Sequence, residues 1–230
     1  LALTVFGPNG SVKTAQTAVL AGRGRLELDA AARFPGITED DSIEVTAERG
    51  IVGLELFGDA DSVACLEAME GDAAGAVLYA PHVATGDFGV AYQSVLTLVN
   101  TTDDSLSLTL TLYADNGVSV ASVNRTIPAR GKLEAEVADL FGLTGAFTGY
   151  LAADPQGAPG LAGSLTFGEA GAGRFLSALP LAPQAHNRFL LGHIANGRIG
   201  TVDYFTGLAL LNPDTQISNR VQITAYDQTG

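Results

Sequence analysis

Residues 106–113, Leu-Ser-Leu-Thr-Leu-Thr-Leu-Tyr, place a leucine at every second position. Successive side chains of a β-strand point to opposite faces, so this pattern predicts a strand that buries its leucines and exposes the residues between them. Asn116-Gly117 follows directly, and an Asn-Gly pair favours the tight turn of a β-hairpin. The stretch therefore predicts an antiparallel hairpin with one face in a hydrophobic core.

Strand and turn signals continue on both sides of this hairpin. Further strands are predicted at 95–100, 118–127, 131–136, 147–153, 160–167 and 174–181, with short helical turns at 30–34 and 137–141 where the alternation breaks. No helical pattern is long enough to cross over between parallel strands. Short strands with turns about every ten residues are typical of sandwiches. We therefore expect an all-β fold of antiparallel β-sandwiches, Ig-like or jelly-roll-like.

The chain repeats its own motifs in a fixed order. The strand 110–113 ahead of Asn116-Gly117 recurs as 3–6 ahead of Asn9-Gly10, and the strand recurs again at 223–226. The other matched pairs of segments are 24–27 with 131–134, 51–58 with 161–168, and His82 to Asn100 with His193 to Asn212. Shared order predicts tandem repeats of about 110 residues.

The phase of the repeat divides the chain into three parts. Residues 80–189 form a complete central sandwich, 1–79 hold the later strands of one sandwich, and 190–230 hold the first strands of a further unit. The two end segments are complementary, so 190–230 could complete 1–79, within the chain or between molecules. The alternative is that the sequence is a piece of a longer array.

Composition limits the classes of partner. Hydrophobic residues make up 47% of the chain and charged residues 16%, which is typical of a folding chain, and the net charge is -13. An acidic surface repels phosphate backbones and anionic lipids, and no apolar run approaches the roughly 20 residues of a membrane span. We expect no nucleic acid partner and no membrane insertion. The single cysteine, Cys65, is expected to be a buried core thiol.

The inventory of reactive residues is small. Three histidines, one cysteine and no nucleophile-elbow, phosphate-loop or zinc-helix motif indicate that the chain is not an enzyme. Candidate binding residues are the equivalent histidines and nearby tyrosines, His82, Tyr92, His193 and Tyr204, although a structural role is the competing interpretation. We expect no cofactor and no metal site. Calcium is the alternative, on carboxylates in acidic turns at 39–41, 59–61 and 103–104.

A unit with a histidine, an apolar strand ending in asparagine, the Pro-Ala-Arg-Gly-Lys-Leu turn at 128–133 and a late Gly-Ser-Leu-Thr-Phe strand at 163–167 is a recognisable pattern. It resembles uncharacterised β-sandwich repeats of bacterial secreted and surface proteins and is distantly similar to the sensory-rhodopsin transducer family. That resemblance implies a β-sandwich that binds partners without chemistry. It also implies an extracellular or cell-surface location, with any signal peptide removed or outside this sequence.

We therefore expect a non-enzymatic structural or adhesive repeat module of an extracellular bacterial protein. Its partners would be neighbouring repeats or further copies of itself, joined by β-strand completion. The alternative is a ligand-binding module for a glycan or a protein, built around the candidate residues named above.

Overall fold

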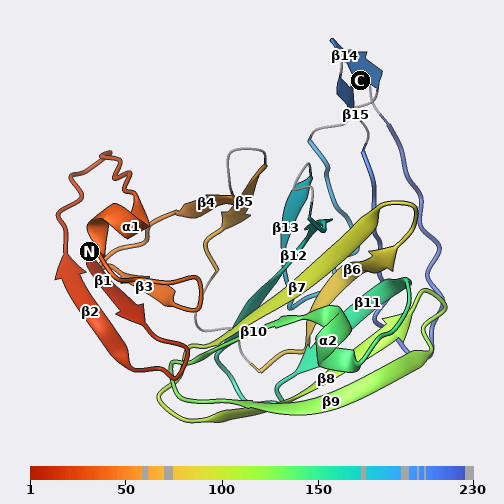
Figure 1. The fold of residues 1–230 in the computed structure, drawn as a ribbon, viewed down its shortest axis with the longest axis horizontal. Coiled ribbons are helices and arrows are strands. Elements are labelled where there is room, and N and C mark those ends of the chain that lie inside the picture. Colours follow the sequence, from red (N-terminus) through yellow and green to blue (C-terminus); the bar gives the residue numbers. More distant parts are fainter. Residues whose placement is uncertain are drawn as a thin grey trace. The chain divides into compact units, whose positions relative to one another are not determined.

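The computed structural model describes residues 1–58, 62–69, 75–171, 175–192, 197–200, 202–204 and 206–225 (Figure 1). The described fold is mainly β, with antiparallel sheets and two very short helices, as the sequence predicted. The chain divides into two compact units, Leu1–Gln184 and Ala185–Gly230, which are taken separately below. None of the described helices has the length and apolar character needed to cross a membrane.

The central region of the first unit holds eight strands and one helix. Helix α2 (Val137–Phe141) lies where the sequence predicted a helical turn, and each predicted strand of this region is present. The strands are β6 (Leu78–Asp87), β7 (Ala91–Asn100), β8 (Leu106–Ala114), β9 (Ser119–Ile127), β10 (Lys132–Glu136), β11 (Phe147–Asp154), β12 (Leu161–Glu169) and β13 (Leu176–Pro180).

These strands pair in the order β13-β12-β7-β6-β11-β8-β9, with β10 along β7. Strands β6 and β7 pair only beside their hairpin, where Gly86 lies opposite Tyr92 and Asp87 opposite Ala91. Strand β6 then continues along β11, whereas β7 continues between β12 and β10. The β6-β11-β8-β9 group and the β13-β12-β7-β10 group are thus joined at one short hairpin.

One buried cluster contains residues from both groups of strands. Leu106, Leu108, Leu110 and Leu112 of β8 are all buried, which confirms the alternation predicted for 106–113. The same cluster includes Leu96 and Leu98 of β7, Leu151 of β11, Leu161 and Leu165 of β12, and Val137 and Leu140 of α2. Burying a leucine side chain contributes roughly 1.5–3 kcal/mol, so this cluster is the main source of stability of the central region.

The N-terminal region holds a three-stranded sheet and a separate hairpin. The sheet has the order β2-β1-β3, from β1 (Ala2–Phe6), β2 (Val12–Thr17) and β3 (Ser42–Thr46), and β4 (Leu54–Gly58) pairs with β5 (Val63–Glu67). Helix α1 (Ala30–Arg33) lies in the predicted 30–34 turn, and Asp29 caps it by accepting a hydrogen bond from Ala32 N. Phe34 is buried against Leu3 and Val5 of β1.

The prediction for Cys65 was wrong. Strand β5 buries Ala64 and Leu66 on one face, and Cys65 between them is exposed on the other. The alternation of a strand reverses the face at each residue, and the apolar neighbours of Cys65 gave no indication of which set faces inward.

The second unit contains a short hairpin, β14 (Gly197–Ile199) with β15 (Val202–Tyr204). Residues 206–225 form no strand, and most of their side chains are exposed.

Candidate assembly interface

Strands of the N-terminal region pair in the same order as strands of the central region. The β2-β1-β3 sheet has the connections of β9-β8-β11, and the β4-β5 hairpin has those of β12-β13. The registers also agree with the sequence matches: Phe57 lies opposite Ala64 as Phe167 lies opposite Ser177. The β6 and β7 strands have no counterpart among β1 to β5.

One turn has the same geometry in both regions. Gly24 N donates to Ala21 O at 2.8 Å, and Gly131 N donates to Pro128 O at 2.9 Å. The residue before each glycine is an arginine in the left-handed region, with φ of 59° at Arg23 and 57° at Arg130. Few residues other than glycine adopt this backbone conformation, so its occurrence at matched arginines indicates a shared local structure.

The turn at 128–131 also contacts the N-terminal region. Pro8 O accepts a hydrogen bond from Lys132 N at 3.0 Å, so the β1-β2 turn lies directly on the β9-β10 turn. Gly10 is so close that a Cβ atom there would lie 1.7 Å from Ala129 O. No other residue fits at Gly10 without separating the two turns.

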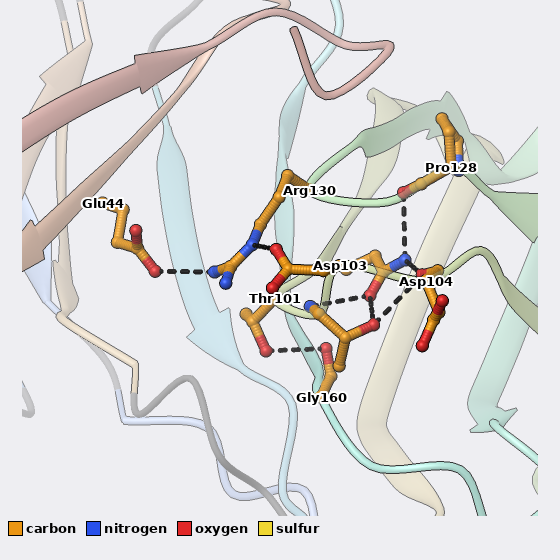
Figure 2. A network of polar contacts seen from close by, with 9 residues as sticks. Glu44, Thr101, Asp103, Asp104, Pro128, Arg130 and Gly160 are labelled. Carbon is orange, nitrogen blue, oxygen red and sulfur yellow. Dashed lines mark hydrogen bonds and ion pairs between the residues drawn. The ribbon is translucent and has the colours of Figure 1, made fainter. Parts of the chain in front are cut away.

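Arg130 binds both regions through its side chain (Figure 2). Its Nη1 atom lies 3.0 Å from Glu44 Oε1 in β3, and its Nε atom lies 2.8 Å from Asp103 Oδ1 in the β7-β8 loop. The hydrogen bond from Arg130 lowers the pKa of Asp103, and the two acids raise the pKa of Arg130. Arg130 and Asp103 therefore stay ionised at neutral pH. The Arg130–Glu44 pair joins the two regions, and because its side chains are partly exposed it contributes about 1 kcal/mol or less.

Asn100 holds the turn from inside the central region, where it is fully buried. Its Nδ2 group donates to the carbonyls of Asp104, Ile127 and Pro128 at 2.7, 3.2 and 2.9 Å. Its Oδ1 atom accepts from the backbone and the hydroxyl of Thr102. Beside it, Thr101 Oγ1 donates to Gly160 O at 3.0 Å (Figure 2). The Asn100 side chain thus ties the end of β7 to the end of β9 at Ile127 and Pro128, and to the β7-β8 loop at Asp104.

The matched residue in the second unit makes a similar set of local bonds. Asn212 Oδ1 accepts from Asp214 N at 3.2 Å, two residues further on, as Asn100 Oδ1 accepts from Thr102 N. Asn212 Nδ2 donates to Ile217 O at 2.7 Å. Asn212 is exposed, whereas Asn100 is buried. The loop after Asn212 therefore has similar local hydrogen bonds, although the Asn212 side chain is not covered as that of Asn100 is.

The structure describes the side chains of only two of the four predicted binding residues, His82 and Tyr92. His82 lies half-buried in β6 with its ring edge-on to Phe167, at 4.9 Å between centroids, and burial lowers its pKa against a smaller opposing effect of Asp115. The ring of Tyr92 in β7 lies edge-on to that of Phe88, with 6.2 Å between the ring centroids. In the described part of the chain no ring contact or hydrogen bond joins His82 to Tyr92. His193 lies outside the described residues, and of Tyr204 only its backbone in β15 is described.

One carboxylate in each of the two described acidic turns, 39–41 and 103–104, forms an ion pair. Asp41 pairs with Lys13 at 2.7 Å, and Asp103 pairs with Arg130. No three His, Cys, Asp or Glu side chains within the described ranges lie close enough together to hold a metal ion. Asp59 and Asp61, proposed as calcium ligands, lie outside the described residues.

Comparison with known proteins gives one distant structural likeness. No protein-family model and no curated protein matches the chain. Among solved structures, the chain is similar to the one described as "Crystal Structure of Thermotoga maritima 1070", at 15% sequence identity and a TM-score of 0.40. The match covers 48% of this chain and 96% of that chain.

Sequence reasoning did not identify the residues that build this interface. Arg130 was assigned only to a turn, and Glu44 and Asn100 were given no separate role. Two signals were present: an Arg-Gly pair at matched positions 23–24 and 130–131, and an asparagine that ends the matched strands at 100 and 212. A repeated polar residue at an element's end indicates a conformational requirement more directly than a lone histidine does.

Proposed function

We propose that the chain is a non-enzymatic structural or adhesive module of an extracellular bacterial protein, built from tandem antiparallel β-sandwiches that pack end to end. The observation that supports this proposal is the contact of the β1-β2 turn with the β9-β10 turn. Arg130 strengthens it by pairing with Glu44 across the contact, and Asp103 holds Arg130 in place. The sandwich assignment is supported by the single buried cluster shared by both groups of central strands.

The interface has a direction. In the central region, the turn at 128–131 contacts the N-terminal region through the turn at Asn9-Gly10. The counterpart of that N-terminal turn in the central region is the turn at Asn116-Gly117. These two turns lie at opposite ends of β9, a strand of 9 residues. At about 3.3 Å per residue they are separated by roughly 30 Å. A contact between unlike ends that repeats without closing generates a linear array, which suits a spacer or a fibre.

The docking position at the second end is open. A Cβ atom built on Gly117 meets no atom of the described residues within 4 Å, in contrast to Gly10. Both glycines have left-handed backbone, with φ of 82° and 81°. The central region therefore presents the same turn as the N-terminal region, in the same conformation and with room for a further neighbour. Among the described residues no contact joins His82 to Tyr92, so the ligand-binding alternative has no comparable supporting observation there.

Replacement of Arg130 by glutamine tests whether the interface couples the two regions. Losing the Arg130–Glu44 ion pair, the one of the two that joins the regions, is expected to weaken the coupling by about 1 kcal/mol or less, equivalent to a factor of up to about 5 in local opening. Amide hydrogen exchange in β1 and β3 should accelerate by that factor, while exchange in β8 and β11 stays as in the native protein.

The matched control is Arg125→Gln, because the Arg125 side chain donates only to the carbonyl of Asn124 in its own strand. That variant should leave exchange unchanged in both regions. Unaltered protection of β1 and β3 in Arg130→Gln would show that the contact does not join the regions mechanically, and the spacer function would fail.

A further inference from the structure

Three tyrosines lie on the outer face of the β6-β11-β8-β9 group, the side of these strands that is turned away from the buried cluster. Tyr79 of β6, Tyr150 of β11 and Tyr113 of β8 occupy strand positions out of phase with the buried core residues. Tyr150 lies opposite Tyr113, and their rings stack with 4.7 Å between centroids and 6° between planes. Each of the three side chains is half-buried. The outer face thus holds tyrosines on three neighbouring strands.

A row of paired hydroxyl and amide side chains continues from the tyrosines along β8 and β9. The hydroxyl oxygens of Thr111 and Ser122 lie 3.2 Å apart, and Thr109 Oγ1 donates to Asn124 Oδ1 at 2.9 Å. Gln156, in the β11-β12 loop, donates to Thr109 Oγ1 at 3.2 Å. The row ends at a surface hollow of about 380 Å³, lined by Ser107, Leu108, Asn124, Arg125, Thr126 and Gln156. The tyrosines and the hollow are about 20 Å apart along β8.

The repeated fold does not require this arrangement. The positions equivalent to Tyr113 and Tyr150 in the N-terminal region are Phe6 and Ser42, which lie opposite each other in β1 and β3. None of the strands β1, β2 and β3 contains a tyrosine. A cross-strand aromatic pair contributes roughly 0.2–1 kcal/mol to a sheet. Because the equivalent sheet forms without one, sheet stability alone does not account for the tyrosines of the central region.

The outer face offers the contacts that a sugar needs. Tyr150 covers one face of the Tyr113 ring, and because β8 lies between β11 and β9, the other ring face is turned toward the polar pairs. The C–H face of a sugar ring is apolar and packs on an aromatic ring. Sugar hydroxyls donate and accept hydrogen bonds, as hydroxyl and amide side chains do. Burial raises the pKa of Tyr79 and of Tyr150, and proximity to Tyr113 raises both further, so their hydroxyls stay protonated as donors.

The charges favour a neutral ligand. The paired hydroxyl and amide side chains carry no charge, and the carboxylate-bearing Asp154 lies opposite Thr109 on the same face. Of the described residues that line the hollow, only Arg125 is charged. The whole chain has a net charge of -13. An acidic protein repels polyanions, so a sulfated or uronic-acid polymer is disfavoured and a neutral glycan is not.

We infer that the outer face of the β6-β11-β8-β9 group binds a neutral glycan chain. One sugar ring packs on Tyr113, and further units run along Thr109, Asn124 and Gln156 to the hollow. The inference goes beyond the proposed function, because it names a partner for an adhesive module and uses residues of the central region alone. A row of about 20 Å extends past a single sugar ring, so an oligosaccharide should bind more tightly than its monosaccharide.

A glycan array probed with the full chain tests the class of ligand. The array carries short neutral oligomers of hexose and of N-acetylhexosamine beside uronic-acid and sulfated glycans. At least one neutral oligomer should bind. Calorimetry with that oligomer should give a Kd about tenfold or more below that of its monosaccharide, since each added hydrogen bond contributes roughly 1 kcal/mol.

Two variants locate the site on the protein. Tyr113→Ala removes the ring, and Asn124→Ala removes an exposed side chain of the polar row. Each should weaken binding of the same oligomer by about tenfold. Asn124→Ala keeps the test decisive if Tyr113→Ala does not fold. The matched control is Tyr92→Ala, which removes a tyrosine of β7 that lies edge-on to Phe88, and it should bind as the native protein does.

Three results would each overturn the inference: no neutral oligomer binds, only anionic glycans bind, or Asn124→Ala binds as tightly as the native protein. Such a failure is distinct from failure of the proposed function, which is decided by hydrogen exchange in Arg130→Gln. A chain whose exchange shows coupled regions but which binds no neutral glycan remains a structural module without this site.

Discussion

Replacing Asn100 with alanine is expected to destabilise the central region by about 3–5 kcal/mol. The native side chain serves three carbonyls and two groups of Thr102 from a fully buried position. Removing it leaves buried polar groups without partners, and each such group costs about 1–3 kcal/mol. Asp103 and Asp104 of this loop are exposed, so solvent compensates in part and the total stays below the sum.

The measurement is urea unfolding followed by circular dichroism, with Asn124→Ala as the control. Asn124 accepts a hydrogen bond from Thr109 on the exposed face of β9, so its loss should cost about 0.5 kcal/mol or less. Asn100→Asp should be at least as damaging as alanine, because a carboxylate cannot donate to the three carbonyls. Equal midpoints for Asn100→Ala and Asn124→Ala would contradict the assignment of Asn100 as the residue that fixes this end.

Gly10→Ala is expected to separate the N-terminal region from the central region. The new Cβ would lie 1.7 Å from Ala129 O and 2.9 Å from Ala129 C, backbone atoms that cannot move aside like a flexible side chain. The turns must part, and the hydrogen bond from Lys132 N to Pro8 O is lost with them. Cleavage within β1 to β5 by a protease at low concentration should accelerate more than tenfold.

Gly117→Ala is the matched control for Gly10→Ala. Its φ of 82° imposes the same left-handed strain, about 1 kcal/mol, but nothing lies within 4 Å of the new Cβ. The difference between the two variants isolates the contact between turns from the cost of the backbone conformation. Similar proteolysis of the two variants would contradict the tight docking at Gly10.

Local pattern predicted the strands of the central region well. The alternation at 106–113 fixed both the strand and its buried face, and the breaks in alternation located both short helices. Such features depend on side-chain periodicity within one element, which a single sequence displays directly. The strand matched at 24–27 is absent from the structure, although its equivalent β10 is formed. β10 pairs with β7, and no β7 equivalent lies beside 24–28 among β1 to β5.

The interface residues could not be predicted in the same way. The partners of Arg130 come from positions 44 and 103, and nothing in the local pattern relates those distances in sequence to contact in space. The left-handed conformation of Arg130 is also hidden, because arginine rarely adopts it. The matched histidines drew attention because histidine often carries chemistry, yet His82 contacts an aromatic ring in a half-buried position.

Light scattering across a concentration series tests the proposed end-to-end packing most directly. Gly117→Ala places a Cβ atom where the equivalent atom at Gly10 would lie 1.7 Å from Ala129 O, so this variant should be unable to dock on another copy. Val19→Arg, at a 95% exposed position, serves as the control. The unmodified chain and Val19→Arg should grow in mass with concentration, whereas Gly117→Ala should remain at 23.6 kDa. An unmodified chain that stays at 23.6 kDa at every concentration would contradict the account.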